Sequence, residues 1–143
     1  VAATAPVYKI EDVYHFEKYD TVYSRSFLVW TWFQTILLLL FVSHLFGNIA
    51  SIGIPGIYIY GAFIFLFVYA FSELMDRNRY AAVWEIIKAG AGIGIIYYTG
   101  DWFGISSMHP AIKYFLSAYF IISVAVSSWY CFYDTKGQQV TLA

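Results

Sequence analysis

The amino-acid sequence predicts an all-α integral membrane protein whose four transmembrane helices form an antiparallel bundle. The chain of 143 residues is 61% hydrophobic and only 12% charged, whereas soluble domains carry about 25% charged residues. The stretch 26–72 contains no Lys, Arg, Asp or Glu, and about 18 apolar residues already indicate a membrane span. A soluble domain of this length could not bury so much apolar surface. The expected surroundings are therefore a lipid bilayer.

The chain divides into three regions by composition. Residues 1–25 mix charged and aromatic residues and predict a cytoplasmic or interfacial linker. Residues 26–133 are predicted to form the transmembrane domain. The polar residues 134–143 predict a cytoplasmic tail.

Turn signals separate the four spans. The first apolar stretch of about twenty residues would rise about 30 Å as a helix, which matches the hydrocarbon core of a bilayer. The segment "GNIASIGIPG" predicts a turn after it, and "TGDWFGISSMHP" predicts another before the last span. The predicted spans are 27–46, 57–73, 81–98 and 111–131.

The Lys and Arg residues are distributed unevenly between the two sides of the predicted bundle. Lys113 alone falls on one side. The other seven fall on the side of the two termini: Lys9, Lys18, Arg25, Arg77, Arg79, Lys88 and Lys136. Because cytoplasmic loops are enriched in Lys and Arg, we predict that both termini and the turn between the second and third spans face the cytoplasm.

That turn lies in the charged segment 72–88, "SELMDRNRYAAVWEIIK". We expect Arg77 and Arg79 to contact anionic lipid headgroups. Glu85 and Lys88 are three residues apart on the third span and are predicted to pair. The pair would either snorkel to the membrane interface or bridge to the two arginines or to a neighbouring helix. The alternative is a contact with a substrate headgroup or another domain, because ionisable groups at membrane depth are costly and often functional.

Gly90 and Gly94 have the GxxxG spacing on the third span. Small residues at this spacing let another helix approach closely in lipid. The predicted contact is with a helix of this chain, and the alternative is a helix of another subunit or domain.

The three histidines, His15, His44 and His109, contain no pair at metal-binding spacing. His44 and His109 fall near the same, non-cytoplasmic face and would be the candidates for a haem or quinone site. The alternative is two interfacial imidazoles that form hydrogen bonds to loop carbonyls or water.

Several functions are disfavoured by composition and motif. A net charge of −1 argues against a nucleic-acid partner, because phosphate binding needs a clustered positive excess. Cys131 is the single cysteine, so neither an intrachain disulfide nor a CxxC metal motif is possible. No nucleophile elbow or similar motif supports a hydrolase.

The motif "KYD" at residues 18–20, the span that follows it and the hairpin "ELMDRNRYAAVWEIIK" resemble a known arrangement. It is the C-terminal membrane region of the sterol desaturase and fatty acid hydroxylase superfamily, in its alkylglycerol monooxygenase-like branch. Proteins of that branch carry a histidine-rich catalytic domain, then a linker with "KYD", then several terminal membrane helices. The resemblance covers about residues 14–133.

The resemblance implies a location and not a chemistry for this chain. The oxidoreductase chemistry of that family depends on a di-iron site built from HxxxH and HxxHH motifs, and this sequence has none. No catalytic residue, metal ligand or cofactor is therefore predicted here, and di-iron is expected only in a separate catalytic part. The start at Val1 rather than Met agrees with this expectation.

The predicted function is thus the membrane-anchoring accessory region of a sterol desaturase-like lipid hydroxylase, non-catalytic by itself. Its partners would be the bilayer and a catalytic domain, in the inner membrane if the source is bacterial. One alternative is a small structural or assembly subunit of a larger membrane complex. A second alternative is the haem or quinone anchor with His44 and His109.

Overall fold

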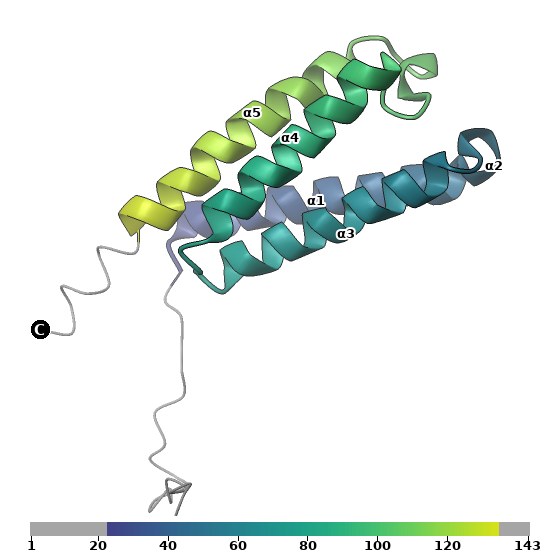
Figure 1. Cartoon of the computed structure of the whole chain (residues 1–143). Coiled ribbons are helices and arrows are strands. Elements are labelled where there is room, and N and C mark those ends of the chain that lie inside the picture. Colours follow the sequence, from purple (N-terminus) through teal and green to yellow (C-terminus); the bar gives the residue numbers. More distant parts are fainter. Residues whose placement is uncertain (1–22, 135–143) are drawn as a thin grey trace, which may run out of the picture.

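The structure is a computed structural model that describes residues 23–134, and its regular elements there are all helical. Four long helices run antiparallel to their sequence neighbours (Figure 1). They are α1 (Arg25–Gly47), α3 (Gly56–Met75), α4 (Ala81–Thr99) and α5 (Ile112–Trp129). The predicted all-α fold with four antiparallel helices is confirmed.

Three short elements complete the described chain: α2 (Ile49–Ile52), a 3₁₀ turn η1 (Ile105–Ser107) and a π-helical turn η2 (Tyr130–Asp134). Each long helix begins and ends within two residues of a predicted span. The short α2 lies in a segment expected to be an irregular turn. The predictions for residues 1–22, which include "KYD" and His15, and for the tail 135–143 lie outside the described residues.

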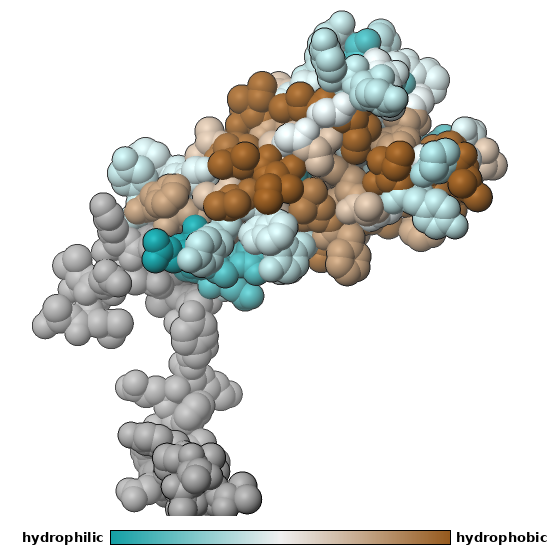
Figure 2. Space-filling view, viewed as in Figure 1, coloured by the Kyte–Doolittle hydropathy of each residue, from teal (hydrophilic) through white to brown (hydrophobic). Residues whose placement is uncertain are grey.

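All four long helices are long and apolar enough to cross a membrane. Their outward faces carry large apolar side chains such as Val29 and Phe65, which are 70% and 80% exposed. Brown, apolar side chains cover the middle of the face seen in Figure 2, and hydrophilic ones gather toward the two ends of the bundle. Burying these side chains in lipid avoids their exposure to water, so the chain is a multi-pass helical membrane protein.

One end of the bundle carries the start of α1, the α3–α4 turn and the end of α5 (Figure 1). We call it the charged end because Arg25, Arg77 and Arg79 lie there. The opposite end carries α2 and the α4–α5 loop. The predicted grouping of the charged turn with both ends of the transmembrane domain is therefore observed, and its cytoplasmic orientation stays a prediction.

The helices pack as a row and not as a closed ring. Backbones approach closely between α1 and α3, between α3 and α4, and between α4 and α5, but hardly at all between α1 and α5. In Figure 1 the α1–α3 and α4–α5 pairs lie close together near the charged end and diverge toward the opposite end.

Trp102, from the α4–α5 loop, fills the core where the helix pairs diverge. Its side chain is fully buried. Its ring centroid lies 4.7 Å from that of Phe63 on α3, 5.1 Å from that of Phe41 on α1 and 6.0 Å from that of Phe120 on α5. Such tilted and edge-to-face pairs are favourable beyond the area that they bury. The loop side chain thus joins three helices in one aromatic core.

The close glycine contact of α4 is at Gly92 and not at the predicted pair. Gly90 and Gly94 are exposed, and a Cβ on either would meet nothing within 4 Å. A Cβ on Gly92 would lie 2.5 Å from the Phe120 ring. Among the described residues, the expectation that a helix of this chain packs on Gly90 and Gly94 is therefore wrong. Their contact with another subunit stays a prediction.

We expect Gly92→Ala to destabilise the bundle by about 2 kcal/mol, because Phe120 is enclosed by aromatic rings and cannot move aside. Thermal unfolding in detergent measures the effect. Gly90→Ala is the matched control and should be neutral or slightly stabilising, because alanine favours the helix over glycine. A larger loss for Gly90→Ala than for Gly92→Ala would contradict this packing.

Candidate functional site

Five polar side chains meet inside the apolar bundle, and all five are 0% exposed. We call them the polar cluster: Gln34 on α1, Glu85 and Lys88 on α4, and Ser123 and Ser127 on α5. Polar groups inside a membrane domain are rare because each must find a partner within the protein. The cluster is therefore the first candidate site.

Helical spacing brings these side chains together. Glu85 and Lys88 are three residues apart, and Ser123 and Ser127 are four residues apart, so each pair lies on one face of its helix. Gln34 lies one turn before Leu37 and two before Phe41, which are both buried, and so it faces the same interior. Three helices thus present polar groups at one level.

An ion pair lies at the centre of the cluster. Lys88 Nζ is 2.7 Å from Glu85 Oε2 and 2.9 Å from Oε1. The same ammonium donates to Gln34 Oε1 at 3.1 Å and to Ser123 Oγ at 3.3 Å. It also lies 4.3 Å from the centroid of the Phe67 ring, a cation–π distance. The positive charge is therefore surrounded by acceptors.

The carboxylate is satisfied as completely as the ammonium. Ser123 Oγ donates to Glu85 Oε2 at 2.8 Å, and Gln34 Nε2 approaches Oε1 at 3.4 Å. Gln34 Nε2 and the Trp30 indole N–H also reach Ser127 Oγ, at 3.4 Å and 3.2 Å. Every member of the cluster thus has a partner on another helix or on the same ion pair.

A buried and fully paired cluster holds the helices in fixed positions relative to one another, and we call this a structural lock. The prediction that Glu85 and Lys88 pair is confirmed, and they bridge to neighbouring helices through Gln34 and Ser123. The snorkelling alternative is wrong, because both side chains are 0% exposed. Glu85 lies about 6 Å and Lys88 about 10 Å along α4 from its first residue, well inside the span.

Arg77 and Arg79 remain at the charged end. Arg79 is exposed, whereas Arg77 is half-buried, with its guanidinium carbon 5.1 Å from the Phe27 ring centroid and 5.3 Å from that of Tyr23. Arg77 thus packs on aromatic rings near the start of α1. Headgroup contact by the two arginines stays a prediction.

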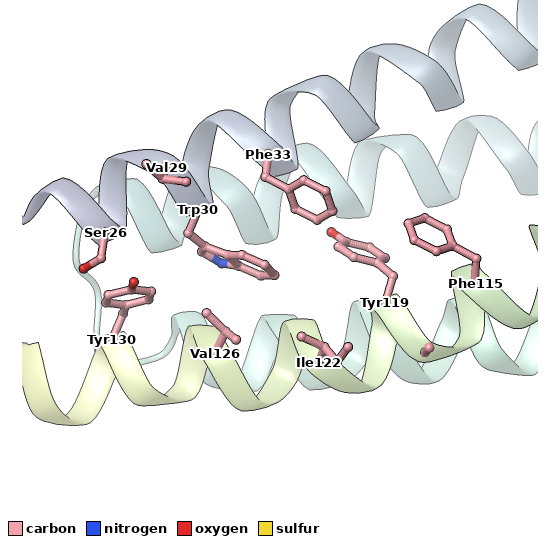
Figure 3. Close-up of a pocket in the computed structure, with 10 residues that line it drawn as sticks. Ser26, Val29, Trp30, Phe33, Phe115, Tyr119, Ile122, Val126 and Tyr130 are labelled. Carbon is pink, nitrogen blue, oxygen red and sulfur yellow. The ribbon is translucent and has the colours of Figure 1, made fainter.

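An open groove of about 500 Å³ lies between α1 and α5, beside the polar cluster (Figure 3). Its walls are apolar and largely aromatic, and its hydroxyl-bearing end is at the charged end, where Ser26 and Tyr130 lie. It follows from the weak packing between α1 and α5. The lining residues are Ser26, Val29, Trp30, Phe33, Phe115, Ala118, Tyr119, Ile122, Val126 and Tyr130.

The two histidines proposed for a haem or quinone site each have a local partner at the opposite end. His44 Nδ1 and the buried Tyr60 hydroxyl share a hydrogen bond of 3.2 Å. His109 is exposed, and its Nδ1 accepts from the Ala111 N–H at 3.2 Å. No hydrogen bond of the described residues links the two imidazoles, and a shared cofactor stays a prediction.

The α4–α5 loop near these histidines is ordered by Asp101. Burial raises the pKa of its carboxyl, but hydrogen bonds from the Ser106 hydroxyl and N–H and from the Trp102 N–H, with the positive charge of Lys113, outweigh burial and hold the pKa below its usual value. The carboxylate therefore stays ionised and fixes the loop that delivers Trp102 to the core.

Within residues 23–134, no three His, Cys, Asp or Glu side chains gather as a possible metal site. No family model matches the chain, and no curated protein or solved structure matches it either.

Sequence reasoning found the ion pair and missed its partners. No motif predicts Gln34, Ser123 and Ser127 as partners of the ion pair, although a glutamine in the middle of a predicted span is itself a signal of internal hydrogen bonding. The sequence does not predict the groove, because its lining residues have the composition of an ordinary membrane span.

We expect Lys88→Met to destabilise the bundle by about 3 kcal/mol, because it leaves the Glu85 carboxylate buried without its counter-ion. The double variant Glu85→Gln/Lys88→Met removes both charges and should be less destabilised than the single variant. Chemical unfolding in mixed detergent micelles measures both.

Arg79→Met is the control for this comparison, because Arg79 lies at the charged end of the bundle and is exposed. It should change stability by less than about 0.5 kcal/mol. A structural lock at Lys88 is refuted if Lys88→Met is no more destabilised than this control.

Proposed function

We propose that this chain is the membrane-anchoring accessory region of a sterol desaturase-like lipid hydroxylase, and that the α1–α5 groove forms part of the path of the lipid substrate. The observation that carries this proposal is the groove itself. It is apolar along its length and carries hydroxyl groups at the charged end (Figure 3). This is the polarity of a lipid that lies along the bilayer normal.

The size of the groove supports a lipid ligand. Its lining residues on α5 and the first residue of η2 run from Phe115 to Tyr130, which corresponds to about 22 Å of helix. One leaflet of hydrocarbon is about 15 Å thick. A volume of about 500 Å³ is within the range of about 300–1,000 Å³ for small-molecule sites.

The arrangement of the bundle supports an anchoring role. The start of α1 and the end of α5 lie at the charged end (Figure 1), so a catalytic part joined to either would sit at the same membrane surface. We place that surface in the cytoplasm, and the membrane is the inner membrane in a bacterium. The di-iron chemistry would belong to the catalytic part, and this chain would be non-catalytic by itself.

A second candidate function is a structural subunit of a larger membrane complex. It is favoured by Gly90 and Gly94, which are exposed on α4 with open space around them. A helix of another subunit could approach the α4 backbone closely there.

The test is purification of the tagged chain from its native membranes, followed by protein identification and elemental analysis. We expect it to be recovered with, or as part of, a protein with histidine motifs, and to carry iron only in that complex. Stoichiometric iron on the isolated chain would overturn the non-catalytic role. Recovery with unrelated subunits would favour the second candidate.

A thiol-reactive reagent that cannot cross membranes tests the orientation independently. We expect a cysteine placed at the exposed Arg79 to be labelled only after the membrane is opened. Labelling of that cysteine in intact cells would mean that the charged end faces outward and would remove the proposed cytoplasmic catalytic part.

A further inference from the structure

We draw no further inference here: the strongest candidate, the open apolar groove between α3 and α4 that Ala62, Ala91 and Gly94 help to line, carries nothing, because no feature of the described part of the chain shows what covers it.

Discussion

The arrangement of the bundle depends on the ion pair between Glu85 and Lys88. Both charges are removed from solvent, and such a pair is tolerated only when every lone pair and proton has a partner. Those partners come from Gln34 on α1 and Ser123 on α5. The requirement therefore fixes the rotation of α4 and the positions of α1 and α5. This matters in a lipid bilayer, because burial of apolar surface does not drive helices together there.

The opposite end of the bundle is held by shape rather than by charge. Trp102 packs between Phe41, Phe63 and Phe120, and the Asp101 carboxylate orders the loop that carries it. The polar cluster and this aromatic core together fix both ends of the row of helices. Neither brings α1 against α5 over its whole length, and the groove is the consequence.

The polar cluster and the open α1–α5 side together give the proposed anchoring role a physical basis. Helices held by a polar lock form a rigid anchor, while the unpacked α1–α5 side leaves a path open to the bilayer. The groove and the lock share a wall, because Trp30 lines the groove and donates to Ser127. A lipid in the groove would therefore lie against a surface whose shape is fixed by the cluster behind it.

The sequence by itself determined the four spans, the grouping of the charged turn with both ends of the domain, and the pairing of Glu85 with Lys88. Hydropathy and helical spacing are local properties, so composition and periodicity suffice for them. The tertiary structure decided that Gly92, and not Gly90 or Gly94, contacts a neighbouring helix. It also decided that Gln34 and the two serines complete the hydrogen bonds of the ion pair, and that a groove remains between α1 and α5. These depend on the rotation and spacing of helices, and apolar residues that face lipid and apolar residues that face protein look alike in a sequence.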